Sequence, residues 1–520
     1  MMKPTHHGSR LIVIGAGITG LSTALAWKRS FPDAGHSVIV LEKNNIPGGC
    51  VTTFAREGYR FDTTQIIPDV SDLLEYFGVD IPLHRFDHHY ARLFLADTAS
   101  RSTTMIPVPS SHLAFEQSLV QRYPDEAGNI AAFFSYCRQM HKELNFLKTE
   151  PRWHQLPSIL YHCRKILANS NKTYAAFLDR FRFRNEEIRE VLDIFSSFSG
   201  LSADRCAALL TACAMITTLN GSYRPGKGFI QFPLALKKRL LDLGGELKTQ
   251  CEVTQILTSS GKVRGVALSD GQVLEADYVV STVDTKWCYD VLLRDEHDTW
   301  QNHAYFRKLR NVRMSPSGFA IQLGLDEGVD LAKYGLDCGY CVLTTGRHAH
   351  ARMFDAWEKD TLLRSETCFH MGIVSPSTIT GGKPNLIIHV VPVPSAYWIQ
   401  LRQQDYQRYL REKREVADFY IRKADEYLIP GLSSHIRLVE ISTPATYKRY
   451  IGSPGGSQYD MMPVPSNFGK NRLPSRTPIE GLFIPKFSHG IWPAMQGGLQ
   501  VVDMITGGKV MGGNASLSHA

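Results

Sequence analysis

The hydrophobic pattern near the N-terminus predicts a strand, a glycine turn, a helix and a second strand in direct succession. The apolar run 11–14 is short and unbroken, which is typical of a strand buried in a parallel sheet. Apolar residues at helical spacing follow over 18–30, and a second apolar run stands at 37–41. Because this order is strand, helix, strand, we expect a βαβ unit with its sheet at the centre of a domain.

The same pattern predicts further elements along the chain. We expect loop and a short helix over 62–95, and helical periodicity runs from about 110 to 214. Apolar runs predict strands ending near 253, at 263–268, at 278–282, at 314–326 and at 385–394, with helices over 231–243 and 397–427. The chain therefore contains both strands and helices, which predicts a mixed α/β protein. Its length of 520 residues allows two or three subdomains.

Three glycines lie between the first strand and the first helix. Gly15, Gly17 and Gly20 have G-x-G-x-x-G spacing, and Glu42 follows the second strand twenty-two residues after Gly20. The glycines permit a tight turn, close approach of a pyrophosphate and close packing of helix on strand, while the carboxylate accepts hydrogen bonds from a ribose. The glycines alone are a weak signal, but their order with strand, helix and acid predicts a dinucleotide site.

A second glycine pair separates a flavin site from a nicotinamide site. Gly48 and Gly49 come directly after the ribose acid, where a nicotinamide dehydrogenase has no need of them. A long cofactor running deep into the protein does need backbone close to its diphosphate and ribityl chain. The alternative is an ordinary glycine turn between two strands.

The chain resembles the phytoene desaturase and carotenoid isomerase group within the FAD-dependent amine oxidase-like flavoproteins. The resemblance rests on the glycine fingerprint, on Glu42-Lys43 with Gly48-Gly49, on the Gly-Tyr-Arg-Phe-Asp segment at 58–62, and on blocks at 222–228, 244–256 and 481–500. It spans nearly the whole chain. It implies an α/β fold with a glutathione reductase-like FAD-binding Rossmann domain, an α+β substrate part with a mixed sheet, and a helical membrane-facing insertion.

The resemblance also implies that these parts are discontinuous in sequence. The FAD-binding domain is expected in three stretches, with a helical insertion and a substrate domain between them. The expected division is 1–95, 221–300 and 441–520 for the FAD-binding domain, 96–220 for the insertion and 301–440 for the substrate domain.

The resemblance assigns FAD contacts to the fingerprint, to the adenine-side strands and to the C-terminal block. The helix of that block is expected to aim its N-terminus at the flavin, where the helix dipole stabilises negative charge. The expected contacts are Gly15, Ala16, Gly17, Ile18, Thr19, Gly20, Glu42, Lys43, Gly48, Gly49, Thr64, Gln65, Val253, Asp284, Trp492, Met495 and Gln496.

Two positions depart from the family pattern. Thr64-Gln65 stand where relatives carry a glycine beside the flavin ring, and Lys486-Phe487 stand where relatives commonly carry Gly-Asp. We therefore expect altered backbone geometry at the first position and one lost contact at the second. No catalytic acid or base is identifiable; His489 and Trp492 are the candidate catalytic residues, and a purely structural role for His489 stays open.

Composition and charge limit the partners. The formal net charge of +8 is mild, and no basic run dense enough for nucleic acid is present. Basic and aromatic residues are frequent at Trp153, His154 and 161–165, and arginine alternates with phenylalanine over 180–184. Such segments suit either a lipid surface or packing within the protein.

The ten cysteines lack the spacing of a disulfide framework, so we expect reduced thiols. Cys338 and Cys341 have redox-motif spacing with His348 and His350 close by, but no second ligand pair stands at fixed spacing, so we expect no metal. No run of eighteen apolar residues is present, so we expect a cytoplasmic protein whose membrane contact is peripheral.

The function expected from the resemblance is FAD-dependent chemistry on a long apolar polyene or isoprenoid. A desaturase passes hydride from substrate carbon to flavin N5, with quinone or oxygen as the final acceptor, and an isomerase uses reduced flavin without net oxidation. Two alternatives remain open: an amine oxidase-like or tailoring oxidase acting on a smaller soluble metabolite, and a flavin-binding scaffold without catalysis.

Overall fold

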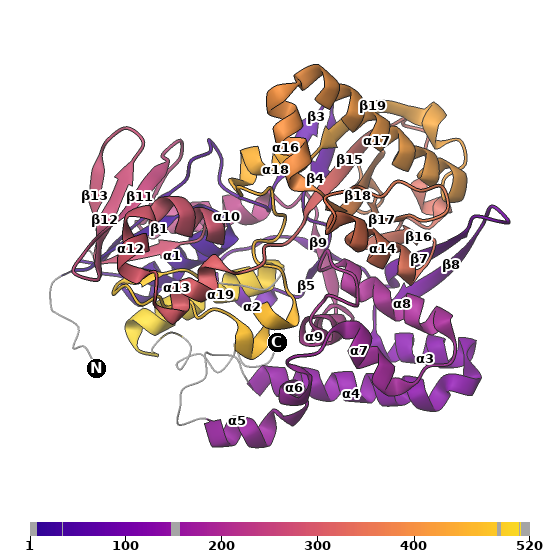
Figure 1. Ribbon diagram of the computed structural model, residues 1–520, viewed down its shortest axis with the longest axis horizontal. Coiled ribbons are helices and arrows are strands. Elements are labelled where there is room, and N and C mark those ends of the chain that lie inside the picture. Colours follow the sequence, from indigo (N-terminus) through magenta and orange to yellow (C-terminus); the bar gives the residue numbers. More distant parts are fainter. Residues whose placement is uncertain (1–7, 34, 147–155, 486–489, 509, 511–520) are drawn as a thin grey trace.

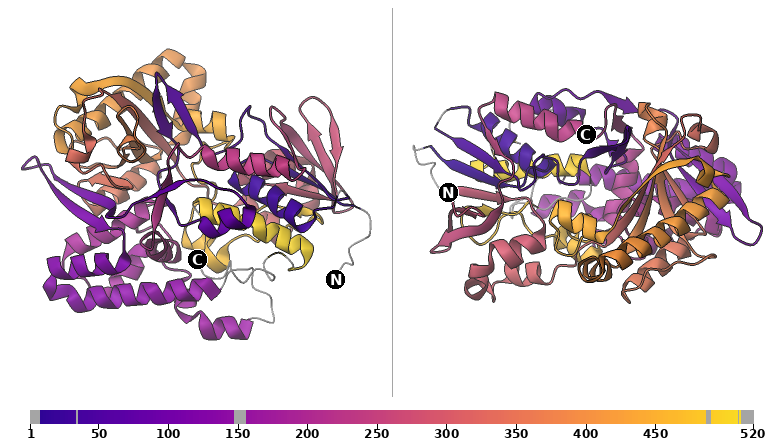
Figure 2. Two further views of the ribbon diagram at one scale, coloured as in Figure 1. Left: turned by 180° about the vertical axis from the view of Figure 1, so that it is seen from behind. Right: turned by 90° about the horizontal axis from the view of Figure 1, so that it is seen from above.

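The computed structural model describes residues 8–33, 35–146, 156–485, 490–508 and 510. Two lobes, each built on a sheet, lie side by side, and a layer of helices lies beneath the second lobe (Figure 1). The view from behind in Figure 2 keeps the two lobes and the helical layer apart in the same way. The protein is therefore an α/β molecule with a separate, mostly helical region.

The first lobe is built on a five-stranded parallel sheet. Its strand order is β10-β2-β1-β14-β20, and every neighbouring pair is parallel. The apolar runs at 11–14 and 37–41 form its centre, because strands covered on both faces bury every side chain. The strands are β1 Arg10–Ile14, β2 Ser37–Leu41, β10 Glu246–Lys248, β14 Tyr278–Ser281 and β20 Leu482–Phe483.

Helices and a small sheet cover this parallel sheet. The helix α1 (Ile18–Ser30) packs against α10 (Gln231–Asp242) and α19 (Ile491–Thr506), so segments from both ends of the chain share one core. The antiparallel sheet of β11 (Val253–Ser259), β12 (Lys262–Leu268) and β13 (Val273–Glu275) packs with the other face. The five strands therefore come from three separate stretches of sequence, with the remaining chain inserted between them.

The second lobe is built on a seven-stranded mixed sheet. Its order is β19-β15-β18-β17-β16-β7-β8, with β16 and β7 parallel and the other pairs antiparallel. Its strands are β7 His89–Asp97, β8 Ser102–Pro109, β15 Ser317–Leu325, β16 Tyr340–Thr344, β17 His370–Val374, β18 Asn385–Val393 and β19 Ile436–Ser442. Helices α14 Arg347–Trp357, α16 Ser395–Gln404, α17 Tyr406–Tyr427 and α18 Pro444–Ile451 pack around it.

The expectation of loop and short helix over 62–95 is wrong in its second half. The predicted helix is α2 (Ser71–Phe77), but β6 (Leu83–Arg85) and β7 follow it. The strand β7 is buried on both faces, since Leu93 lies in the core of the helical region and Phe94 in the core of the second lobe. Its apolar residues do not alternate, and its partner β16 lies far along the chain, so no local pattern marks it as a strand.

The helical region follows β8 and ends before β9 (Ser222–Pro225). Its helices are α3 His112–Arg122, α4 Ala127–Phe146, α5 Leu156–His162, α6 Arg164–Asn169, α7 Tyr174–Leu178, α8 Glu186–Ser197 and α9 Ala208–Thr218. Phe181 and Phe183 point into the core of this region. The alternative of packing within the protein therefore holds for 180–184.

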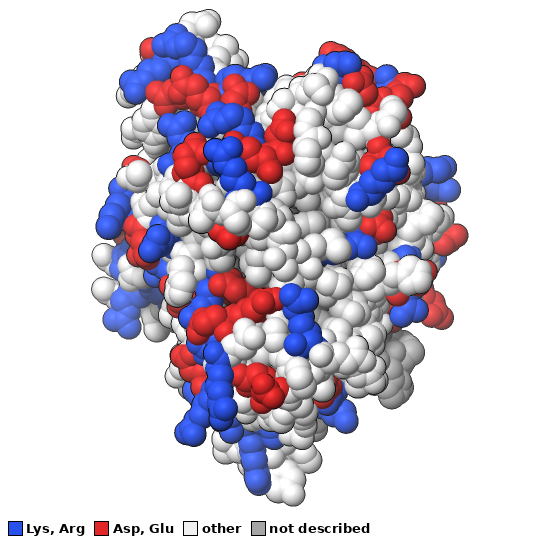
Figure 3. Space-filling view, turned by 90° about the vertical axis from the view of Figure 1, so that its right-hand side faces the viewer, with Lys and Arg blue, Asp and Glu red and all other residues white. Residues whose placement is uncertain are grey.

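Charged side chains of both signs are mixed over the molecular surface. Figure 3 shows the face that carries the β7–β8 hairpin, where lysines and arginines alternate with aspartates and glutamates. No helix in the described part of the chain is both long and apolar enough to cross a bilayer.

Candidate cofactor and substrate site

The turn between β1 and α1 leaves room for a phosphate group. Gly15 has φ of +97°, which favours glycine, and Gly17 precedes the first residue of α1 without a side chain that caps the helix. A Cβ atom on Gly17 would meet nothing within 4 Å, whereas one on Gly20 would lie 2.0 Å from the carbonyl oxygen of Gly15. Gly20 therefore permits helix packing, and Gly17 borders open space at a helix N-terminus, where anions are stabilised.

The predicted ribose acid is buried and held beside this turn. Glu42 is 6% exposed; its Oε2 accepts a hydrogen bond from the Ala16 amide at 2.9 Å, and its Oε1 accepts two from Asn44, both at 2.9 Å. A carboxylate has about four acceptor positions. One position on Oε2 thus remains for a ribose hydroxyl.

The second glycine pair packs directly on the first turn. The Gly48 amide donates to the Ala16 carbonyl at 2.9 Å, and a Cβ on Gly49 would lie 3.5 Å from the Cα atom of Gly17. Gly48 and Gly49 have φ of +140° and +59°. Two backbone segments therefore approach each other at the point where the sequence predicts the diphosphate.

The side chain of Cys50 lies close to residues from distant parts of the sequence. Burial among protein atoms raises the pKa of its thiol to about 11, with Asp460 and Asp284 contributing. Burial likewise raises the pKa of Tyr459 to about 12, with a contribution from Cys50, and raises that of Tyr447, to which Tyr459 and Cys50 contribute. The segment after Gly48-Gly49 therefore lies beside Tyr459.

Two other predicted contacts are Val253 and Lys43. Val253 begins β11, close to Glu42, whose carbonyl accepts from the Cys251 amide at 2.8 Å. Lys43 extends toward Gly452, where a Cβ would lie 2.5 Å from Nζ.

Asp284 has a structural role in the fold. Its carboxylate caps the short helix α11 (Thr285–Trp287) by accepting from the Lys286 and Trp287 amides at 2.9 and 3.0 Å, and it also accepts from Ser457 Oγ at 3.1 Å. The side chain is thus committed to neighbours within the protein.

The departure at Thr64-Gln65 needs no glycine. Neither residue has positive φ. The Gln65 carbonyl accepts from Arg224 Nη1 at 2.7 Å, and Arg224 forms a buried ion pair with Asp62. Burial lowers the pKa of Arg224, and the Asp62 carboxylate opposes this shift. The segment after β4 (Tyr59–Asp62) is thereby tied to β9.

The C-terminal helix α19 lies beside α1 with its N-terminus uncapped by any side chain. Trp492 is partly buried, Met495 is fully buried and Gln496 is 6% exposed, all next to the core that α1 helps to form. A Cβ on Gly498 would lie 2.7 Å from the Thr23 backbone nitrogen, so the two helices are in close contact. His489 and Lys486-Phe487 lie outside the described residues.

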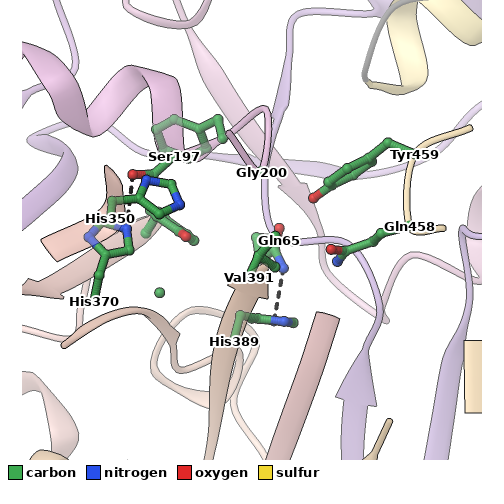
Figure 4. A pocket seen from close by; sticks show the side chains of 12 residues that line it. Gln65, Ser197, Gly200, His350, His370, His389, Val391, Gln458 and Tyr459 are labelled. Carbon is green, nitrogen blue, oxygen red and sulfur yellow. Dashed lines mark hydrogen bonds between the residues drawn. The ribbon is translucent and has the colours of Figure 1, made fainter. Parts of the chain in front are cut away.

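A pocket lies between the second lobe, the helical region and the segments that hold Gln65 and Gln458. Its polar lining includes three histidines: His350 of α14, His370 of β17 and His389 of β18. Figure 4 shows that the Gln65 amide nitrogen meets His389 Nε2, at 2.8 Å, while Ser197 Oγ meets His370 Nε2, at 3.1 Å. The complete lining is Gln65, Ser197, Phe198, Gly200, Tyr340, His350, His370, Gly372, His389, Val391, Gln458 and Tyr459.

Burial keeps these histidines neutral. It lowers the pKa of His350 to about 3 and that of His389 to about 4, and it lowers that of His370 well below its usual range, with a further contribution from His350. The rings of His350 and His370 stack with centroids 4.1 Å apart and planes 4° from parallel. Two neutral rings stack in this way without the repulsion of like charges.

The sequence did not reveal this pocket. Its members come from four distant stretches of chain, and no shared spacing marks them. His350 stood out only through its proximity to Cys338 and Cys341, whose Sγ atoms lie 3.4 Å apart in a buried position. No group of metal-ligating side chains is found among the described residues.

The parallel sheet, the glycine turn at a helix N-terminus and the buried carboxylate of Glu42 are typical of a dinucleotide-binding fold. The chain belongs to the family of flavin containing amine oxidoreductases, whose model matches residues 18–420. It is thus a flavoenzyme of the oxidoreductase class, as the glycine pattern predicted.

Relatives cover most of the chain. Prolycopene isomerase from Daucus carota is 27% identical over 503 residues, which cover 91% of this chain and 75% of that protein. A neurosporene-forming phytoene desaturase from Cereibacter sphaeroides is 22% identical over 484 residues, covering 89% and 87%. An oxidoreductase structure from Methanosarcina mazei shares the fold, with a TM-score of 0.65 at 15% identity over 95% of this chain and all of that one.

Proposed function

We propose that this protein is an FAD-dependent oxidoreductase that acts on a long polyene or isoprenoid, as a carotenoid desaturase or isomerase does. The observation that carries the proposal is the pocket whose wall includes Tyr459, a neighbour of Cys50 just after the Gly48-Gly49 turn, in a chain whose relatives over about nine-tenths of its length are named for carotenoids. This arrangement suits an extended cofactor that begins at the glycine turn and has its reactive end directed toward a substrate pocket.

The residues present fit FAD. Gly17, Ile18 and Thr19 would bind the diphosphate through backbone amides, and Glu42 would accept a ribose hydroxyl at its remaining position. Gly48 and Gly49 would lie along the ribityl chain, with Gln65 and the N-terminus of α19 near the ring. When bound, the flavin supplies two-electron chemistry by taking or returning a hydride at N5.

The protein's own side chains would position the substrate and exclude water from it. Tyr340, Phe198 and Val391 would give the substrate apolar contact at the pocket wall. The neutral histidines place no charge in the pocket, so the pocket accepts an uncharged substrate. The dipole of α19 would stabilise negative charge on the reduced ring without any side-chain acid.

The first experiment is an anaerobic visible spectrum of the purified protein with phytoene or prolycopene in liposomes. Bleaching of the oxidised flavin bands by phytoene supports a desaturase, with quinone or oxygen as the final acceptor. Conversion of prolycopene only after chemical reduction of the flavin supports an isomerase. If neither polyene changes the flavin or is itself changed in either redox state, the proposal is wrong.

A second candidate is oxidation of a smaller soluble metabolite. The polar lining of the pocket favours it, because a hydrocarbon forms no hydrogen bonds. Full activity of lipid-free protein on a soluble amine or alcohol would support this candidate.

We also propose that this protein is cytoplasmic and contacts a membrane peripherally. Leu160 and Tyr161 of α5 are 63% and 65% exposed, and the Arg164 guanidinium lies 5.0 Å from the Tyr161 ring centroid. An apolar tip beside a basic group suits the boundary between lipid tails and phosphates.

A further inference from the structure

The pocket that holds His350, His370 and His389 has an unusual lining for a hydrocarbon substrate. Eight of its twelve residues carry a side chain that donates or accepts hydrogen bonds: Gln65, Ser197, Tyr340, His350, His370, His389, Gln458 and Tyr459. Pockets for apolar ligands are lined mainly by apolar side chains with a few polar groups that fix orientation. Here the polar groups are the majority, so the pocket is built to meet polar atoms.

The described lining is also free of formal charge. It contains no Asp, Glu, Lys or Arg among the residues that the structure describes, and its histidines are neutral because burial lowers their pKa. A buried ammonium or carboxylate on a ligand would need a partner of opposite charge. The lining therefore disfavours amines and acids and suits neutral polar groups.

Two polar atoms in the pocket wall have no partner within the described protein. They are Nδ1 of His370, a residue that is 7% exposed, and Oε1 of Gln458. A buried polar atom without a hydrogen bond costs about 1 to 3 kcal/mol, so such atoms in a pocket commonly bond to a ligand or water. Figure 4 places them on opposite sides of Gln65 and His389.

We propose that this pocket binds a neutral oxygen group of the substrate, a hydroxyl or a carbonyl, and that the substrate is an oxygenated isoprenoid rather than a pure hydrocarbon. This inference rests on the proposed function and specifies its substrate class. A hydroxyl both donates and accepts, so it pairs with Gln458 Oε1 or with His370 Nδ1 in either tautomer. Phe198 and Val391 contact the hydrocarbon part that carries the oxygen.

The test is a binding series of C20 isoprenoids that share one skeleton and differ at one end. The probes are geranylgeraniol, geranylgeranial, the corresponding hydrocarbon, geranylgeranoic acid and geranylgeranylamine, titrated anaerobically into oxidised holoprotein in nanodiscs. The perturbation of the flavin spectrum reports binding, and measured partition coefficients correct for uptake by lipid. We expect the alcohol and aldehyde to bind at least about fivefold more tightly than the hydrocarbon, since one or two hydrogen bonds distinguish them.

Variants show whether the preference arises in this pocket. Gln458→Met and His370→Phe remove the two unpaired atoms at nearly constant volume, and each is expected to lower the preference for the alcohol toward unity while hydrocarbon binding persists. His141→Phe is the control, because this partly buried histidine bonds to Thr217 in the helical region, outside the pocket. The flavin-to-protein ratio and the melting temperature of each variant show that it has folded.

Some outcomes overturn this inference without touching the proposed function. Hydrocarbon binding as tight as alcohol binding, tightest binding of the acid or amine, absence of binding throughout the series, or an alcohol preference that both pocket variants retain would each do so. The proposed function fails on a different measurement, when C40 polyenes leave the flavin and themselves unchanged in both redox states. The two failures are therefore distinguishable.

Discussion

At the scale of single residues, Glu42 is the side chain whose role is most narrowly set by its surroundings. Three of its acceptor positions hold backbone and side-chain donors, and the remaining position faces the turn at Ala16. Glu42→Ala is expected to weaken FAD binding by about 10- to 100-fold, because a hydrogen bond to a charged group contributes about 1.5 to 3 kcal/mol. Flavin retained after dialysis, measured by absorbance against protein, checks this.

The control for this prediction is Glu252→Ala, which removes an exposed carboxylate near the start of β11. Its flavin retention should equal that of the wild type. If both variants retain flavin equally well, Glu42 does not bind the ribose.

Arg224 is the second residue with a defined role, this time in stability. Its side chain is 1% exposed and pairs with Asp62, which also accepts from the Phe229 amide at 3.1 Å. Arg224→Met leaves a buried carboxylate without its cation, which is expected to lower the free energy of unfolding by about 3 to 5 kcal/mol. Urea unfolding followed by tryptophan fluorescence measures this, with the exposed Arg85→Met as the control.

The sequence predicts some site residues and hides others for a physical reason. Glycines and an acid at fixed spacing reveal a turn, because local backbone geometry requires them. His350, His370 and His389 belong to separate elements whose pairing depends on the whole sheet, so their meeting has no local signature. Arg224 likewise is an unremarkable basic residue until β9 places it beside Asp62.

At the scale of elements, the contact between α1 and α19 joins the two ends of the chain. Gly498 allows it, since a Cβ there would lie 2.7 Å from the Thr23 nitrogen and 2.9 Å from the Ser22 Cβ. Gly498→Ala must push the helices apart and is expected to destabilise the protein by about 1 to 3 kcal/mol. Gly128→Ala in α4 is the matched control, because a Cβ there meets nothing within 4 Å and alanine favours helix by about 0.5 to 1 kcal/mol.

Thermal unfolding of both alanine variants measures the difference. The melting temperature should fall for Gly498→Ala and stay level or rise for Gly128→Ala. If the two variants have equal melting temperatures, α19 moves on α1 to accommodate the added methyl group without loss of stability.

The helix α5 carries the surface proposed to contact lipid. Leu160→Ser with Tyr161→Ser is expected to reduce binding to anionic liposomes several-fold, because the two side chains bury apolar area in the bilayer at about 25 cal/mol per Å². Co-sedimentation measures bound protein. Leu113→Ser, at an exposed leucine of α3, is the control. If the control loses as much liposome binding as the α5 variant, α5 is not the lipid-contacting surface.

Elements with helical periodicity or an unbroken apolar run were predictable, whereas β7 was not. The predicted helix 231–243 is α10, Gln231–Asp242, and the predicted strand 37–41 is β2. Their patterns follow from one buried stripe or an unbroken apolar run between turns. The strand β7 was missed because Arg92 interrupts its apolar run while two cores bury its opposite faces.

At the scale of the whole molecule, the histidine pocket joins parts that fold from distant sequence. A sheet strand, a helix of the second lobe and the end of α8 all meet there, together with the segment after β4. The order of strands in each sheet could not be derived from the chain, because pairing such as β16 with β7 is decided by the packing of the complete core. The resemblance to a family supplied the fold that local patterns did not.

Protonation of this pocket contributes to the response of the whole molecule to acid. His350 and His389 have folded pKa values of about 3 and 4, below the usual 6.5. The unfolded chain therefore binds protons below about pH 6.5 while the folded protein does not, so their contribution to stability is present above that pH and is lost as pH falls. Each histidine contributes a slope of up to about 1.4 kcal/mol per pH unit.

Two carboxyl groups of α8 act in the opposite direction. Burial raises the pKa of Glu190 to about 7 and that of Asp193 to about 6, so lowering the pH relieves the cost of their buried charge. Glu190→Gln with Asp193→Asn is expected to stabilise the protein near neutral pH and to steepen its loss of stability toward about pH 4, because the opposing contribution of these two carboxyl groups is then removed. Adding His350→Phe should make that loss shallower again. Urea midpoints between about pH 7 and about pH 4 measure both changes, and parallel curves for all three proteins would show that the pocket does not control acid stability.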